Sequence, residues 1–117
     1  MTFVQQYSAR RYTPGAHLSH RGVLSFNMET QRQCGLKPGM FLTLYYDPQS
    51  QQLAFQIHGD DQPQPRGSVK LFRSHLSSAH VSIRAIMNRN GILPGRYLAE
   101  FDNASHRIVL TPESDAQ

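Results

Sequence analysis

The chain contains a single cysteine, Cys34, among its 117 residues. One thiol excludes an internal disulfide framework and a zinc site built from four cysteines. Cys34 directly precedes a glycine that is expected to end a helix, and the negative end of the helix dipole raises a thiol pKa. We therefore expect a small buried side chain rather than a nucleophile, in a reducing, cytoplasmic setting.

Long apolar runs and enzyme signatures are also missing. No apolar segment approaches the roughly 18 residues of a membrane-spanning helix, and the N-terminal stretch MTFVQQYSARRY lacks the apolar core of a signal peptide. The chain has no Gly-x-Ser-x-Gly, no P-loop and no His-Glu-x-x-His sequence. We expect no membrane partner, no cofactor and no enzymatic activity.

Acidic residues are few and unevenly placed. The chain has twelve Lys and Arg against eight Asp and Glu, a formal net charge of +4. No acid occurs from Gln62 to Leu98, a stretch with six basic residues, and Glu29 is the only acid before Asp47. A surface of one sign attracts phosphate and releases counterions, so this distribution predicts a nucleic-acid-binding face. An acidic protein partner is the alternative.

Histidine raises the question of a metal site. The sequence HLSH begins at His17, and HLSSAH begins at His75. Zinc needs four well-placed ligands, and Cys34 and Asp60 are the only obvious additions. Because HLS at both places is better explained by a duplication, no metal site is predicted.

The strongest internal signal is a repeat. The segment GLKPGMFLTLYYD, from Gly35, returns 56 positions later as GILPGRYLAEFD, from Gly91. Each copy is preceded by HLS, then by a short alternating stretch (VLSF or HVSI), then by a polar segment of seven or eight residues. Five features in the same order indicate an internal duplication with one-residue slips in register.

Each copy predicts the order strand, strand, helix, strand, strand. Asn27 is suited to cap the first helix, while Gly35 and Gly91 are suited to end the two helices in a left-handed conformation. Pro94-Gly95 fits a type II turn. The expected strands are 3–7, 22–26, 40–46, 52–57, 68–74, 80–83, 96–101 and 107–111, and the expected helices are 28–34 and 84–90.

These elements divide the chain into two halves, residues 1–58 and 68–112, joined by a polar linker at 59–67 and followed by a mobile tail at 113–117. A unit of about 45 residues cannot bury its own core. We therefore expect the halves to interlock about a pseudo-two-fold axis as one small, mainly β barrel with short helices. Residues 8–16 are expected to connect the first two strands.

The runs GVLSFNMETQRQCGLKPGMFLTLYYDPQSQQLAFQI and VSIRAIMNRNGILPGRYLAEFDNASHRIVLTP each resemble the AbrB/SpoVT swapped-hairpin domain. The resemblance implies a tandem ββαββ pseudo-dimer, as a monomer or homodimer, that binds double-stranded DNA as a transcriptional regulator or antitoxin-like autoregulator. A protein-interaction or inhibitor module that binds a toxin or polymerase is the alternative, and a SymE-like RNA-directed toxin is a third.

On this reading, the first hairpins and the helices present one basic face, where some arginines position the DNA through phosphates and others contact bases. The arginines expected to bind nucleic acid are Arg10, Arg11, Arg21, Arg32, Arg73, Arg84 and Arg89. Four aromatics that recur between the halves offer stacking surfaces for single-stranded bases. Their alternation along strands favours core positions instead. They are Phe41, Tyr45, Tyr97 and Phe101.

Overall fold

The computed structural model describes residues 13–58, 64–73 and 79–113. Within these ranges the protein is mainly β with two short helices, as the sequence predicts. In chain order, the elements are β1 (Gly15–Leu18), β2 (Val23–Phe26), α2 (Met28–Cys34), β3 (Phe41–Asp47), β4 (Gln52–His58), β5 (Val69–Lys70), β6 (Phe72–Arg73), β7 (Ala79–Ser82), α3 (Arg84–Asn90), β8 (Gly95–Asp102) and β9 (Arg107–Pro112).

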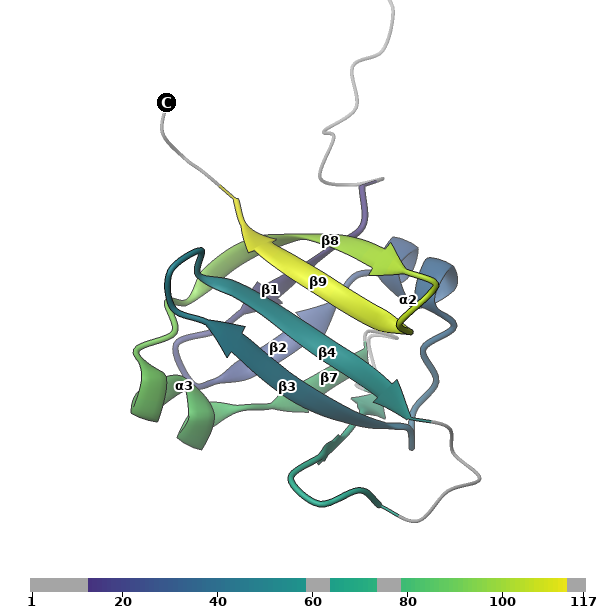
Figure 1. Cartoon of the computed structure of the whole chain (residues 1–117), viewed down its shortest axis with the longest axis horizontal. Coiled ribbons are helices and arrows are strands. Elements are labelled where there is room, and N and C mark those ends of the chain that lie inside the picture. Colours follow the sequence, from purple (N-terminus) through teal and green to yellow (C-terminus); the bar gives the residue numbers. More distant parts are fainter. Residues whose placement is uncertain (1–12, 59–63, 74–78, 114–117) are drawn as a thin grey trace, which may run out of the picture.

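The strands form one antiparallel sheet in the order β5-β3-β4-β9-β8-β1-β2-β7-β6. The two end strands, β5 and β6, are consecutive in sequence and flank Leu71. This residue hydrogen bonds toward β3, since its N–H donates to the Met40 carbonyl at 2.8 Å. A single stretch of chain, β5 to β6, thus joins both edges of the sheet. When β5 and β6 are counted as one interrupted strand, the sheet is a nearly closed, eight-strand, barrel-like structure (Figure 1).

Alternate residues of the strands point inward and build one core with members from both halves. At its centre the Phe26 and Phe55 rings meet edge to face, with centroids 5.7 Å apart. Leu24, Val81 and Leu110 pack in the same cluster and are fully buried. The alternation also dictates the outer surface, because every residue between two inward ones faces away from the core.

The two halves exchange strand partners. The first strand of each half pairs with the third strand of the other, because β1 pairs with β8 and β5 pairs with β3. Two further pairings, β2 with β7 and β4 with β9, also join the halves. Leu24 opposes Val81 in one of these pairings, and Ala54 opposes Val109 in the other.

The first strand of the first half differs from the prediction. The expected strand at 3–7 lies outside the described residues, whereas β1 begins at Gly15, inside the stretch that was expected to be a connection. Gly15 donates its N–H to the Thr30 hydroxyl at 2.7 Å, and that hydroxyl donates to the Gly15 carbonyl at 2.9 Å. The strand is thus fixed by a helix residue, a long-range contact that four residues of sequence do not reveal.

Both helices have the predicted bounds. Asn27 caps α2, because its side-chain oxygen accepts from the Thr30 N–H at 2.9 Å. Gly35 and Gly91 end the helices with φ of 65° and 66°, as expected. Among the described residues, no helix is long and apolar enough to cross a membrane.

The prediction of a type II turn at Pro94-Gly95 is wrong. Gly95 is the first residue of β8 and pairs with Leu18. The corresponding Pro38-Gly39 in the first half does form a turn, in which the Met40 N–H donates to the Lys37 carbonyl at 3.2 Å. Gly95 does have the positive φ, 135°, that the prediction requires of a glycine, but pairing with Leu18 makes it a strand residue.

Candidate nucleic-acid interface

The outer face of five neighbouring strands carries one continuous row of side chains. The strand register places Arg96 opposite His17, His17 opposite Ser25, Ser25 opposite His80, and His80 opposite Phe72. These residues come from β8, β1, β2, β7 and β6, and each alternates with inward neighbours. We call these five residues the outer row. Neighbouring strands lie about 4.8 Å apart, so the row is about 19 Å long.

One end of the outer row is aromatic and cationic. Phe72 is 51% exposed although it is a large apolar residue. Its ring centroid lies 6.1 Å from that of His80, with 31° between the planes. The Lys70 ammonium lies 5.9 Å from the Phe72 centroid, within reach of a cation–π interaction. This end therefore presents an exposed ring beside a positive charge.

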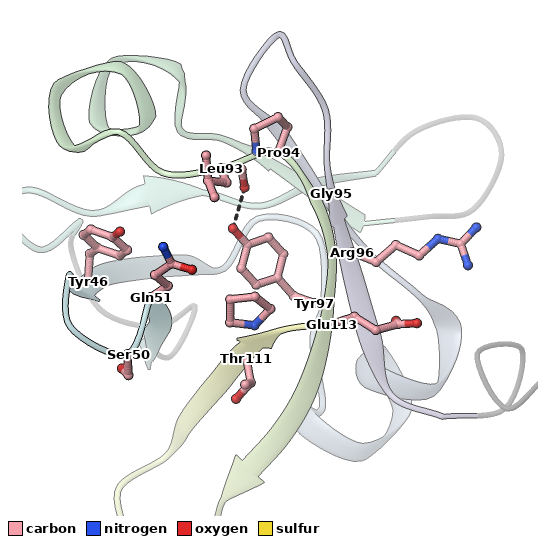
Figure 2. Close-up of a pocket in the computed structure, with 11 residues that line it drawn as sticks. Tyr46, Ser50, Gln51, Leu93, Pro94, Gly95, Arg96, Tyr97, Thr111 and Glu113 are labelled. Atoms are coloured by element: carbon pink, nitrogen blue, oxygen red, sulfur yellow. Dashed lines mark hydrogen bonds between the residues drawn. The ribbon is translucent and has the colours of Figure 1, made fainter. Parts of the chain in front are cut away.

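The other end of the outer row carries Arg96. Figure 2 shows the side chains of Arg96 and Tyr97 pointing to opposite sides of β8. Arg96 is exposed, whereas Tyr97 is buried. Two acids accompany this end: Glu100 faces outward further along β8, and the Glu113 N–H donates to the Arg96 carbonyl. The row itself has no acid, and its Phe72 end is the more basic.

The structure brings two of the predicted arginines together. Arg21 lies in the turn between β1 and β2, and Arg84 is the first residue of α3; both are exposed. They meet through Gly22, whose carbonyl accepts from the Ile83 N–H at 2.7 Å. A Cβ on Gly22 would lie only 2.4 Å from the Arg84 Cα, so only glycine allows this approach.

Among the described residues, Arg89 shares α3 with Arg84, whereas Arg32 lies on the other helix. Arg32, on α2, and Arg89, on α3, lie near opposite ends of the barrel (Figure 1). Arg32 also pairs with Glu29 at 3.4 Å, which offsets its charge locally. The backbone of Arg73 belongs to β6, next to Phe72. Arg10 and Arg11 lie outside the described residues.

The wall opposite the outer row has a different character. On β9, Arg107 donates its Nε–H to Gln56 at 2.9 Å, and its guanidinium lies 4.9 Å from the Tyr45 ring centroid. The hairpin turns beside this wall carry Asp47 and Asp102. Hydrogen bonds lower the pKa of both carboxyls, the largest cause being a serine hydroxyl in each turn. The Arg107 cation on this wall is thus in contact with an amide and an aromatic ring, and it lies near the acid Asp102.

Of the four recurring aromatics, Tyr97 is buried and Phe41 and Phe101 are half-buried, in keeping with core or core-edge positions. Tyr45 is 50% exposed, and its ring is covered on one side by Arg107. These four do not form a stacking surface together. The exposed aromatic ring of the outer row is Phe72, which the repeat pattern does not single out.

A pocket of about 480 Å³ opens near the start of β8. Tyr46, Leu93, Pro112 and the Tyr97 ring form its apolar walls, and the Gln51 amide points inward among them (Figure 2). The Tyr97 hydroxyl donates to the Leu93 carbonyl. Burial, followed by the nearby Tyr46, raises the pKa of Tyr97, so this phenol stays neutral at physiological pH. The pocket offers mainly apolar contact, and Arg96 and Glu113 are the charged residues in its lining.

The structure gives no reason to assign catalysis to Cys34. The thiol is half-buried, and this burial raises its pKa to about 11. The sequence predicts the same direction from the helix dipole, whereas the cause in the structure is desolvation. In the parts of the chain that are described, no group of three or more His, Cys, Asp or Glu side chains is placed to hold a metal ion.

No residue of the outer row is among the arginines that the sequence predicts to bind nucleic acid. Arg96 in the row and Lys70 beside it belong to the acid-free stretch of the chain, so their charge is visible in the sequence. The two histidines draw attention only as metal ligands. Phe72 reads as an ordinary strand residue. These residues lie in one row because strands from both halves pair, and the register of that pairing cannot be predicted from local sequence.

Comparison with known proteins adds no assignment. No family model matches the chain, and no curated protein or solved structure matches it either.

Proposed function

We propose that the protein binds nucleic acid through the outer row. The single observation that carries this proposal is the continuous row across five strands, with Arg96 at one end and Phe72 with Lys70 at the other. Cations spaced along the outer wall of the barrel match a phosphate backbone, whose binding is driven by counterion release.

The side chains of the outer row and the neighbouring Lys70 would contact different parts of the nucleic acid. Lys70 and Arg96 would hold phosphates, and Arg can do so through two parallel hydrogen bonds. His17, Ser25 and His80 supply hydrogen-bonding groups between the two cations. Phosphate contacts position the ligand and supply most of the affinity, while the central groups contact sugars or bases.

We also propose that the two halves are duplicated copies interlocked as a pseudo-dimer of the AbrB-like kind. The exchange of first and third strands between halves supports this proposal, as do the β2–β7 and β4–β9 pairings. A regulator of transcription, which the sequence resemblance implies, would apply the same face to DNA. The two units differ in sequence, so the target need not be a palindrome.

The test is a salt titration of binding to labelled random DNA, single-stranded and duplex, followed by fluorescence anisotropy. Arg96→Gln should weaken binding several-fold and reduce the slope of log K against log salt by about 1. Arg107→Gln removes the same charge from the opposite wall and should change the slope little. If the wild-type chain binds neither form at low salt, the proposal fails, and an acidic protein becomes the partner to seek.

A further inference from the structure

We propose that Phe72 is a base-stacking platform and that the preferred ligand is single-stranded nucleic acid. This inference rests on the proposed function and deepens it, because it names the form of nucleic acid that the same surface takes. The bases of a duplex are stacked inside the helix, and only an unpaired base can lie flat on a protein ring.

The exposure and orientation of Phe72 carry the first step. Its neighbour Leu71 is fully buried, so the chain places one apolar side chain in the core and leaves the next 51% exposed. The His80 ring centroid lies 6.1 Å from that of Phe72, and the Lys70 ammonium lies over the Phe72 ring at 5.9 Å, yet half of the residue remains exposed. Contact between half of an apolar ring and water is unfavourable, and no described neighbour removes it. A base stacked on the ring would do so.

The setting of the ring carries the second step. Phe72 ends a row of polar side chains on paired strands, and all five residues of the row belong to strands and not to a helix of the kind that enters the major groove of a duplex. The Lys70 ammonium beside the ring is placed for the phosphate next to a stacked base. Arg96 lies about 19 Å away along the row, which suits an extended strand that crosses the sheet.

The opposite wall provides a matched contrast. Tyr45 is 50% exposed, close to the value for Phe72, but its ring already stacks against the Arg107 guanidinium at 4.9 Å. Both rings therefore have a cation over them, but the distances differ: the Arg107 guanidinium is close to Tyr45 at 4.9 Å, whereas the Lys70 ammonium lies 5.9 Å from the Phe72 centroid, near the limit of a cation–π interaction.

The experiment uses the absence of tryptophan from the chain. The full-length variants Phe72→Trp and Tyr45→Trp each carry one indole, which a stacked base quenches. A thymidine oligomer of about 12 nucleotides should quench the fluorescence of F72W and leave that of Y45W nearly unchanged. A duplex of the same length should quench neither.

A second variant separates stacking from apolar contact. Phe72→Leu keeps apolar area but removes the ring, and should weaken single-strand binding about tenfold while duplex binding changes less than twofold. Tyr45→Leu should change neither. The inference is overturned if wild-type protein binds duplex at least as tightly as single strand, or if F72L weakens both forms alike. Failure of wild-type protein to bind either form at low salt would instead overturn the proposed function itself.

Discussion

The two helices are equal in length but begin in different ways. Helix α2 follows Asn27, whose side chain caps the helix and also donates to the Thr13 carbonyl at 2.8 Å. Helix α3 follows Ile83, which makes no side-chain cap and is buried in the core. The start of α3 packs on the Gly22 turn of the other half instead. The start of α2 thus has a side-chain cap that also ties the helix to the chain before β1, whereas the start of α3 has no side-chain cap and rests on the Gly22 turn.

The difference arises from single-residue changes outside the strands. From Phe26 to Leu42 the first half spans 16 positions, whereas from Ile83 to Tyr97 the second spans 14. One extra residue is Asn27 itself, which separates the strand from the helix. The other lies between Gly35 and β3, where the first half forms its Pro-Gly turn. The positions that face the core correspond in the two halves, because the extra residues lie outside the paired strands and do not shift the strand register.

Removing the glycine that supports the uncapped helix should have the largest effect on stability. Gly22→Ala places a Cβ against Arg84 and forces a residue with a side chain to adopt φ of 86°. We expect a loss of about 3 kcal/mol in the free energy of unfolding, measured by urea denaturation. Gly91→Ala, at φ 66° with open space around it, is the control and should lose about 1 kcal/mol. Equal losses would contradict the close contact.

The last residues of the helices offer a chemical contrast. Cys34 ends α2 with a pKa of about 11, while its counterpart in α3, Asn90, is exposed. At pH 8 the thiolate fraction of Cys34 is about 100-fold below that of an ordinary thiol. Native Cys34 should therefore alkylate slowly with iodoacetamide, and Asn90→Cys in a Cys34→Ser background should react far faster. Similar rates would show that Cys34 is not shielded by burial.

Loss of the cap should weaken only the first half. Asn27→Ala removes the acceptor for the Thr30 N–H and should lower stability by about 1 to 2 kcal/mol. Hydrogen exchange, followed by amide, should show faster opening in α2 than in α3. An equal increase in both helices would mean that the cap acts on the whole barrel and not on its own helix.

The smallest effect should come from the two matched hairpin turns. Asp47 accepts from the Ser50 hydroxyl and Asp102 from the Ser105 hydroxyl, each at 2.9 Å. Because the folded-state pKa of each carboxyl is lowered, each contributes stability above the ordinary carboxyl pKa of about 3.9 and loses it as pH falls through the folded value.

Asp47→Asn and Asp102→Asn should therefore destabilise slightly at pH 7, Asp102→Asn slightly more because Arg107 also favours its charged form, and the difference from the wild-type chain should shrink below about pH 4. Thermal unfolding across pH checks both points. A larger loss for Asp47→Asn at pH 7, or a difference that persists at low pH, would contradict this account.

Local signals predicted most elements of the fold. Both helices appear with the expected bounds, because caps and terminal glycines act within a few residues. The other strands from residue 23 onward also agree closely, except that the strand expected at 68–74 divides at Leu71 into β5 and β6, which pair with β3 and β7. The four-residue β1 was missed because Thr30 and β8 fix it from a distance. The site was predicted least well: arginine positions can be counted in sequence, but a row across β8, β1, β2, β7 and β6 exists only once two halves pair.

The most direct test of the central claim is a nuclear magnetic resonance titration of ¹⁵N-labelled protein with a short single-stranded oligonucleotide. The account predicts that the largest amide shifts fall on His17, Ser25 and His80, in the middle of the outer row. Shifts concentrated on Ala54 and Val109, on the opposite wall, would contradict it.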